Sequence, residues 1–297
     1  MREWLEQQAA TGVLELEPSD DVQGRHYRLS AEHADVLLDR DSLNHLAPLA
    51  QLAVGAMGVM PRLREAYRTG AGIPFADYGE DVRDGQAGVN RAMFLQLMPD
   101  WLAALPELHA RLSSRPSRIA DIGAGAAWSS VGLARAYPLA GVDAYDLDEA
   151  SVALARANVA DAGVAARVRV HLADAGDPAL DGAYDLVAVF EALHDMARPV
   201  DALRTVRRLL APPGVALVVD ERVAEELAAP GDDIERLMYG WSIFHCLPAG
   251  RAESPSAATG TVMREATLRG YAVEAGFQDV EVLPVENLFF RFYRLVP

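Results

Sequence analysis

A glycine-rich segment follows a short apolar run near the middle of the chain, where residues 121–127 read Asp-Ile-Gly-Ala-Gly-Ala-Ala. Glycines let the backbone turn sharply and approach a ligand closely, and a helix that starts directly afterwards presents free N–H groups. An acid, Asp146, ends the next apolar run 21 positions after Gly125. Strand, glycine loop, helix and acid in this order favour a nucleotide-like ligand at the carboxyl edge of a parallel sheet.

Two classes of nucleotide cofactor are bound by loops of this kind, and Trp128 separates them. The dinucleotide fingerprint G-x-G-x-x-G/A needs a small residue at the position that Trp128 occupies. The spacing D-x-G-x-G-x-G/A is instead satisfied by Asp121, Gly123, Gly125 and Ala127. The loop therefore disfavours a dehydrogenase and favours the second spacing.

Short apolar runs alternate with helical patterns from residue 111 onward, which is typical of a parallel sheet with crossover helices. The last two runs are separated by only Val285, Glu286 and Asn287. They must form an antiparallel hairpin, because a parallel crossover needs about a dozen residues. The expected strands are 118–122, 140–145, 167–172, 184–190 and 215–220, with the hairpin at 278–284 and 288–295 and helices at 232–247 and 264–275.

With these elements in place, residues 111–297 resemble a class I S-adenosylmethionine-dependent methyltransferase, whose sheet also ends in an antiparallel hairpin. The expected fold is α/β, with a Rossmann-like seven-stranded sheet and a smaller N-terminal part. The resemblance implies S-adenosyl-L-methionine as the cofactor. It also implies that the loop with Asp121, Gly123, Ala124 and Gly125 wraps the methionine portion of the cofactor. Asp146 would accept hydrogen bonds from the ribose hydroxyls, and Leu147 would pack on the face of the adenine. Asp174 and Ala175 would bind the edge of the adenine, and Glu191 would adjoin the cofactor. Asp148 and Asp177, in the same loops, are expected to face water.

The first 45 residues have a different pattern, with a helix at 2–12, strands at 13–17 and 25–30, and a helix at 31–39. A small α+β cap would show this pattern. The wider chain also resembles an actinobacterial group of methyltransferases that carry an N-terminal winged helix and are related to the small-molecule O-methyltransferases. The stretches that carry this resemblance are REWLEQQAATGVLELE, GIPFADYGEDVRDGQAGVNR, FEALHDM, ERLMYGWSIFHCLP and AGFQDVEVLP. In that group two further helices come first, so we expect an incomplete winged helix. The expected domains are 1–45 for this dimerisation part, 46–110 for a helical connector and cap, and 111–297 for the methyltransferase.

Methyl transfer from a sulfonium is an in-line displacement, in which alignment supplies about 7–11 kcal/mol and a general base a further factor of roughly 10²–10⁴. His194 lies four residues after the fourth expected strand, in FEALHDM. It corresponds to the catalytic histidine of the O-methyltransferases that the chain resembles. His194 is predicted either as the base or as a residue that fixes its loop, and Glu191 and Asp195 flank it as groups that could orient the imidazole.

Substrate contacts are expected from two other segments. Ile234, Met238, Trp241 and His245 fall on one side of the helix expected at 232–247, a stripe that suits either a core or a pocket wall. The loop 248–261 is rich in Gly, Ala, Ser and Pro and is a candidate lid. The predicted substrate-binding residues are Tyr78, Asn90, Met238, Trp241 and His245, with Gln86 and Arg91 as further polar groups of the connector.

Composition limits the partners. With 27 basic and 43 acidic residues the formal net charge is −16, which disfavours nucleic acids and anionic membranes. Residues 1–50 carry 4 Arg and 10 acids, although a winged helix that reads DNA should be basic. No uncharged apolar run is long enough to span a membrane, and the single Cys246 suits a reducing compartment, so a cytoplasmic location is expected. No His, Asp or Glu spacing is typical of metal ligands, and no metal is expected.

The leading hypothesis is therefore an enzyme that transfers a methyl group from S-adenosylmethionine to a small molecule. The acceptor atom is expected to be oxygen, in secondary metabolism, and the protein is expected to be a homodimer joined through residues 1–110. The alternative is a winged-helix transcriptional regulator whose methyltransferase fold senses a ligand without catalysis.

Overall fold

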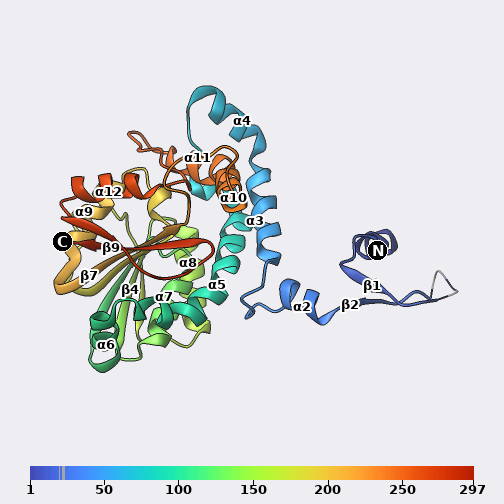
Figure 1. The fold of residues 1–297 in the computed structure, drawn as a ribbon, viewed down its shortest axis with the longest axis horizontal. Coiled ribbons are helices and arrows are strands. Elements are labelled where there is room, and N and C mark those ends of the chain that lie inside the picture. The colour runs from blue at the N-terminus through green and yellow to red at the C-terminus, as the bar shows by residue number, and fades with distance from the viewer. Residues whose placement is uncertain (20, 22–23) are drawn as a thin grey trace.

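A seven-stranded sheet forms the centre of the computed structural model, which describes residues 1–19, 21 and 24–297. The strand order is β5-β4-β3-β6-β7-β9-β8, with β9 antiparallel to both β7 and β8 and the other neighbours parallel (Figure 1). The predicted fold class is confirmed. The strands are β3 Ser117–Ile122, β4 Ala140–Asp146, β5 Val168–Leu172, β6 Tyr184–Phe190, β7 Leu210–Glu221, β8 Asp279–Val282 and β9 Phe290–Val296.

Both faces of the sheet are covered by helices, because successive side chains of a strand point to opposite faces. In β3, Ile119 belongs to the core under α5–α8, whereas Ala120 belongs to the core under α9 and α12. Strands buried on both faces read as continuous apolar runs, as YDLVAVF does in β6. The helices are α5 Gly79–Ala103, α6 Pro106–Ser114, α7 Trp128–Ala136, α8 Glu149–Asp161, α9 Pro199–Leu209 and α12 Glu265–Glu274, with a short 3-10 turn η2 Leu193–Asp195 after β6.

A second helical layer lies beyond the carboxyl ends of the strands. It contains α3 Ala47–Gly58, α4 Met60–Thr69 and η1 Phe75–Tyr78, whose apolar side chains form a separate core cluster. Trp241, Phe244 and Ala249 pack against this cluster from the segment after β7. That segment is the predicted helix 232–247, but it is divided into α10 Asp233–Trp241, a π-helical turn η3 Ser242–Cys246 and α11 Leu247–Gly250. The continuous stripe expected from regular helical spacing is therefore broken.

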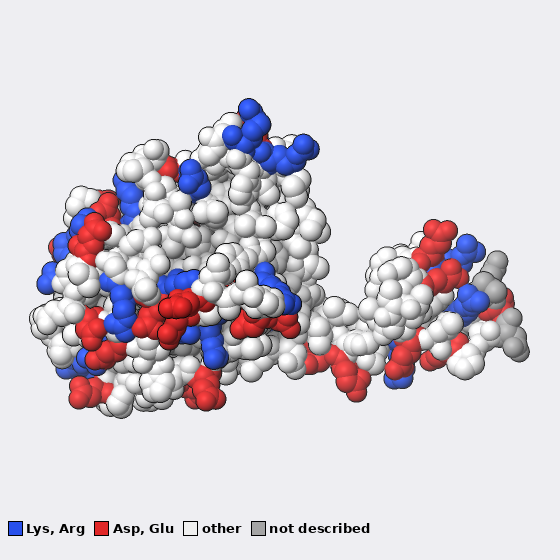
Figure 2. All heavy atoms as spheres, turned by 45° about the horizontal axis from the view of Figure 1, so that its top comes forward, with Lys and Arg blue, Asp and Glu red and all other residues white. Residues whose placement is uncertain are grey.

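The N-terminal segment has the helix, hairpin and helix order that the sequence predicts. Its elements are α1 Arg2–Ala10, the antiparallel pair β1 Leu14–Leu16 and β2 Tyr27–Leu29, and α2 Ala31–Leu37. In Figure 1 this segment stands away from the body, to which α2 leads. Acidic and basic side chains are interspersed on it in the view of Figure 2. Several large apolar side chains remain exposed there, including Trp4, Leu16 and Leu38.

Among the described residues, no helix combines the length and the apolar character that crossing a membrane requires.

Candidate functional site

A cavity of about 520 Å³ opens at the carboxyl ends of β3, β4 and β6, and residues of η1, α5, η3 and α11 also line it. Parallel sheets collect ligands at this edge, and the volume suits a cofactor-sized molecule. The structure brings eleven of the predicted residues to its wall. They are Gly123, Ala124, Gly125, Asp146, Leu147, Asp174, Ala175, Glu191, His194, Asn90 and His245.

The glycine loop is held against β4 by its own amides. Gly123 N and Ala124 N donate to the carbonyl oxygen of Tyr145, at 2.8 and 3.0 Å. The backbone of Gly123 has φ +72°, and a Cβ there would lie 2.6 Å from the Cβ of Ala192. A glycine is required at this position on both grounds, and the bare backbone leaves space for a ligand to approach.

Asp146 ends β4 at the edge of this loop. Its Oδ2 accepts from Gly125 N at 2.7 Å and its Oδ1 accepts from Asp148 N at 2.9 Å. Burial raises the pKa of the Asp146 carboxyl, and the two backbone donors act against that shift. Leu147, next to it, is 59% exposed and lies on the wall.

Asp148 does not simply face water, contrary to the expectation. Its carboxylate accepts from Ser151 N at the start of α8, a helix N-cap, and forms an ion pair with Arg83 at 3.0 Å. The N-cap role arises because the first amides of a helix lack intrahelical partners. Asp177 is not on the wall and accepts from the amide of Ala179.

Asp121 lies below the loop and not on the cavity wall. It is fully buried, and its Oδ2 accepts from the hydroxyls of Ser129 and Ser130, each at 2.6 Å. Burial raises the pKa of Asp121 to about 6. In this position Asp121 connects the loop to the first turn of α7 and can act on a ligand only through the loop.

Asp174 and Ala175 lie on the wall after β5. The carboxylate of Asp174 accepts from Gly176 N at 2.7 Å and forms an ion pair with Arg198 at 2.9 Å. Arg198 also approaches Glu253, at 3.7 Å, from the loop 248–261. Ala249, Ala252 and Glu253 of that segment lie on the wall, so the candidate lid borders the cavity.

His194 is the most enclosed titratable group on the wall, with 2% of its surface exposed. Its Nδ1 lies 2.9 Å from Asp220 Oδ1 and 3.0 Å from Glu221 Oε2, at the end of β7. Because a carboxylate only accepts, Nδ1 carries the proton and donates. Its Nε2 faces Asp195 Oδ1 at 3.3 Å. Both nitrogens of the ring are thus next to carboxylates.

These acids shift the pKa of the His194 imidazole. Burial alone would lower the pKa of the imidazole, but Glu221, Asp220 and Asp195 raise it well above its usual value. Burial raises the pKa of the Glu221 carboxyl to about 8, against the opposing attraction of His194. Burial and the neighbouring Glu221 likewise raise the pKa of Glu191. The neighbouring acids therefore favour the charged form of the imidazole.

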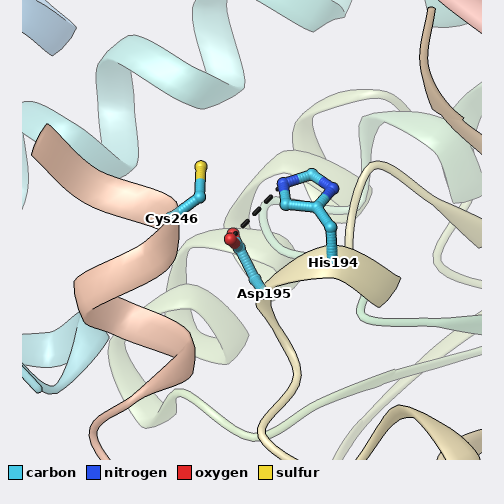
Figure 3. Close-up of side chains that lie close together, drawn as sticks. All are labelled: His194, Asp195 and Cys246. Atoms are coloured by element: carbon cyan, nitrogen blue, oxygen red, sulfur yellow. Dashed lines mark ion pairs between the residues drawn. The ribbon is translucent and has the colours of Figure 1, made fainter. Parts of the chain in front are cut away.

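Cys246 approaches this group from η3, a different segment from the η2 turn that carries His194 and Asp195 (Figure 3). Atoms of His194, Asp195 and Cys246 that could bind a metal lie within 4.8 Å of one another, as do those of His194, Asp220 and Glu221. The sequence analysis could not detect these groupings, because their members come from different strand ends and helices. The expectation of no metal stays a prediction.

Glu191 occupies the first position after β6, with φ +48°. Its Oε2 accepts from Asn90 Nδ2 at 3.1 Å and from Gln86 Nε2 at 3.4 Å, both on α5. Glu191 Oε1 and Asn90 Oδ1 are buried and accept no hydrogen bond from the described residues. Two acceptor atoms on neighbouring side chains of the wall therefore lack a donor.

Three predicted substrate residues, Tyr78, Met238 and Trp241, do not reach the wall. The Tyr78 hydroxyl donates to the carbonyl oxygen of Phe244 at 3.1 Å, and its ring packs edge-on against His245, at 4.7 Å between centroids. Met238 is buried, and Trp241 packs in the α3–α4 cluster. His245, which does reach the cavity, lies within the π-helical turn that follows Trp241. Tyr78 thus packs against His245 without lining the cavity itself. Gln86 lies on the wall, whereas Arg91 instead pairs with Asp41 at 2.5 Å.

The sequence analysis missed Asp220, Glu221, Cys246, Arg83 and Arg198 as members or supports of the site. For the first two a signal existed, since they follow the apolar run VALVV directly and so lie at the carboxyl end of a central strand. The others depend on which loop reaches the cavity, which periodicity does not show.

Comparisons with known proteins agree with this geometry. Residues 120–218 match a family described as a methyltransferase domain. The ubiquinone/menaquinone biosynthesis C-methyltransferase UbiE of Ectopseudomonas mendocina (strain ymp) is 29% identical over 145 residues, which are 46% of this chain and 54% of that protein. The chain thus spans about half the length of this curated relative.

Solved structures extend the similarity of fold over almost the whole chain. The mitomycin 7-O-methyltransferase MmcR has a TM-score of 0.70 at 19% identity, with 99% of this chain and 82% of that chain covered. Human N-acetylserotonin methyltransferase in complex with SAM has a TM-score of 0.61 at 18% identity, with 98% and 81% covered. The family match identifies residues 120–218 as a methyltransferase domain, and the sheet order and the solved structures show that the chain has the fold of class I S-adenosylmethionine-dependent methyltransferases.

Proposed function

We propose that the protein methylates an oxygen atom of a small molecule, with His194 as the general base. The observation that carries the proposal is the position of His194: its Nδ1 is held by Asp220 at 2.9 Å, while the residue lies on the wall of the cavity that the glycine loop borders. A histidine whose Nδ1–H is held by a carboxylate has its Nε2 free to accept a proton once the ring is neutral.

The residues of the wall fit S-adenosylmethionine. Gly123 and Gly125 provide bare backbone for its methionine portion, and Asp146 and Asp174 provide carboxylates for its ribose and adenine. Leu147 provides an apolar face, and Ala175 provides a backbone N–H beside Asp174. Glu191 adjoins the bound cofactor, and Asp121 acts indirectly by fixing the glycine loop. When bound, the cofactor supplies an electrophilic methyl group on a sulfonium.

The chain's own part in the reaction is alignment and proton removal. Walls from α5, η2 and η3 enclose the acceptor, with Asn90 and His245 as contacts. His194 Nε2 accepts the proton of the acceptor hydroxyl, and Asp220 stabilises the imidazolium that results. Asp195 lies 3.3 Å from Nε2, so its carboxylate must move aside or bind the same hydroxyl.

The N-terminal segment supports a further proposal on assembly. Its exposed apolar side chains, of which Trp4 is 57% exposed, favour contact with a second copy. We therefore infer a homodimer joined through residues 1–110, with the partial winged helix at 1–45, the connector and cap at 46–110 and the catalytic part at 111–297. A cytoplasmic location and a role in secondary metabolism belong to the same proposal.

Incubation with S-adenosylmethionine and a panel of phenols, alcohols, amines and carbon acids tests the acceptor atom. Mass spectrometry should detect gain of one methyl group on a hydroxyl compound, and fragmentation should place that methyl on oxygen. The matched control is His194→Gln, which keeps the size of the side chain but removes the base. Methylation of nitrogen or carbon, or equal rates for both proteins, would contradict O-methylation with His194 as base.

A further inference from the structure

The cavity wall has more acidic than basic side chains. Arg83 and Arg198 are the arginines among the described residues that line it, and each is already paired, Arg83 with Asp148 at 3.0 Å and Arg198 with Asp174 at 2.9 Å. Neither guanidinium is therefore available to neutralise an anionic ligand without losing a partner. The acids of the wall are Asp146, Asp148, Asp174, Glu191, Asp195, Glu221 and Glu253.

The imbalance is greatest around His194. Asp195, Asp220 and Glu221 contact its ring, and Glu191 adjoins the same cluster. One imidazolium does not offset the negative charge that these four carboxyl groups would carry if all were ionised, which agrees with the raised pKa values of Glu191 and Glu221. A carboxylate or phosphate entering this end of the cavity would be repelled, whereas a cation would relieve the excess charge.

Glu191 and Asn90 offer defined hydrogen-bond acceptors for such a cation. Asn90 is only 7% exposed, and its Nδ2 donates to Glu191 Oε2 at 3.1 Å. This bond leaves Asn90 Oδ1 and Glu191 Oε1 buried and without a donor. Leaving buried acceptors unsatisfied is energetically unfavourable, because each has lost its hydrogen bonds to water. A protonated amine carries three N–H donors and can satisfy both oxygens at once.

The backbone at Glu191 also indicates a specific role. Its φ of +48° lies in the left-handed region, which non-glycine residues seldom adopt. The conformation is fixed by Glu191 N, which donates to the carbonyl oxygen of Val219 at 2.8 Å, and by the amides of Gln86 and Asn90 on the side chain. Strained residues of this kind concentrate at ligand-binding sites.

We propose that Glu191 and Asn90 form a subsite for a protonated amine of the methyl acceptor, so that the preferred acceptors are amino alcohols or aminophenols and not hydroxy acids. The inference rests on the proposed function, because it assumes that a hydroxyl compound occupies this end of the cavity. The amine would bind between the two free oxygens, and the surrounding acids would exclude acceptors with a carboxylate.

Binding of matched fragments, in the presence of saturating S-adenosylhomocysteine, tests the subsite without requiring turnover. Each pair shares one phenol or alcohol skeleton and differs in an ammonium or a carboxylate; tyramine and 3-(4-hydroxyphenyl)propanoate are one pair. Ligand-observed NMR should show the ammonium members binding about tenfold or more tightly. Glu191→Gln should weaken amine binding about tenfold, and Asn90→Leu, which removes the second acceptor, should weaken it as well.

Glu226→Gln is the matched control, since it removes the same charge from an exposed residue outside the wall. It should leave amine affinity unchanged. The subsite is overturned if no ammonium fragment binds, if carboxylates bind as tightly, or if Glu191→Gln has no effect on amines.

Calorimetry with S-adenosylhomocysteine separates this inference from the proposed function. If wild-type protein fails to bind S-adenosylhomocysteine, the proposed function fails; if it binds but the amines do not, only the subsite fails. A second titration uses the deaminated analogue of S-adenosylhomocysteine. If Glu191→Gln weakens S-adenosylhomocysteine about tenfold but not the deaminated analogue, the two oxygens hold the cofactor's amino group and the acceptor subsite is overturned.

Discussion

The Nδ1 of His194 lies 2.9 Å from Oδ1 of Asp220, although 26 residues separate them in the sequence. The contact arises because β6 and β7 are parallel neighbours, so the loop after one strand meets the end of the other. It fixes the ring orientation and the proton on Nδ1, which makes Nε2 the atom available for chemistry. The same contact helps to raise the pKa of His194 well above its usual value.

His194→Gln should lower kcat by roughly 10²–10⁴ once an acceptor is known, because it removes proton abstraction and leaves alignment. Affinity for S-adenosylhomocysteine, measured by calorimetry, should stay within a few-fold of wild type. A loss below tenfold, or loss of activity together with a lowered Tm, would show that His194 only fixes its loop. An acceptor that is already nucleophilic would then be favoured.

The pH profile should reflect the raised pKa of His194. An unperturbed imidazole would give a rate that rises through about pH 6.5, but the neighbouring acids raise the pKa of His194 well above this value. Since the base acts in its neutral form, kcat should rise through a midpoint above 6.5 and then level. Asp220→Asn removes one acid and should move the midpoint down by about 1 pH unit or more. An unchanged midpoint in that variant would exclude His194 as the titrating group.

Stability of the ligand-free protein should fall as pH rises. Glu221 has a pKa of about 8 when folded, above its ordinary 4.5, so the folded state binds its proton more tightly than the unfolded state. Stability from this group is present below about pH 4.5 and is lost as pH rises towards 8. The raised pKa of His194 acts in the same direction. When Tm is measured between pH 5 and 9 in steps of about one pH unit, it should therefore fall less for Glu221→Gln than for the wild-type protein.

The exposed Glu226→Gln variant controls for net charge and should follow the wild-type curve. A Glu221→Gln curve parallel to wild type would mean that Glu221 titrates as it does in the unfolded chain.

Much of the fold could be predicted, because the spacing of apolar residues along the sequence indicates which faces of the strands and helices are buried. The run YDLVAVF was predicted as a strand at 184–190 and is one, since both of its faces are covered. The division of helix 232–247 was not predictable, because a π-helical turn leaves the apolar pattern of Met238 and Trp241 intact while changing which residue reaches the cavity. Most residues predicted to bind the cofactor follow strand ends beside recognisable motifs, and the structure brings them to one cavity wall, while their role stays a prediction. The cluster around His194 depends on strand order, and its members Asp220 and Glu221 were not predicted.

The oligomeric state tests the role of the N-terminal segment. Light scattering should give about twice the chain mass of 32.0 kDa, and Trp4→Glu should shift the protein towards a monomer, since it places a charge in an apolar contact. Glu3→Gln, in the same helix, is a control that should stay dimeric. A wild-type monomer at all concentrations would contradict the homodimer.

The central claim is that the cavity beside the glycine loop binds S-adenosylmethionine, and titration calorimetry with S-adenosylhomocysteine tests it most directly. We expect one site per chain, and Asp146→Ala should weaken binding about tenfold or more, because the charged acceptor of the ribose hydroxyls is lost. Asp177→Ala removes an acid from the loop after β5 that is not on the wall, and it should bind like wild type. No binding to the wild-type protein, or equal affinity in Asp146→Ala, would contradict the claim.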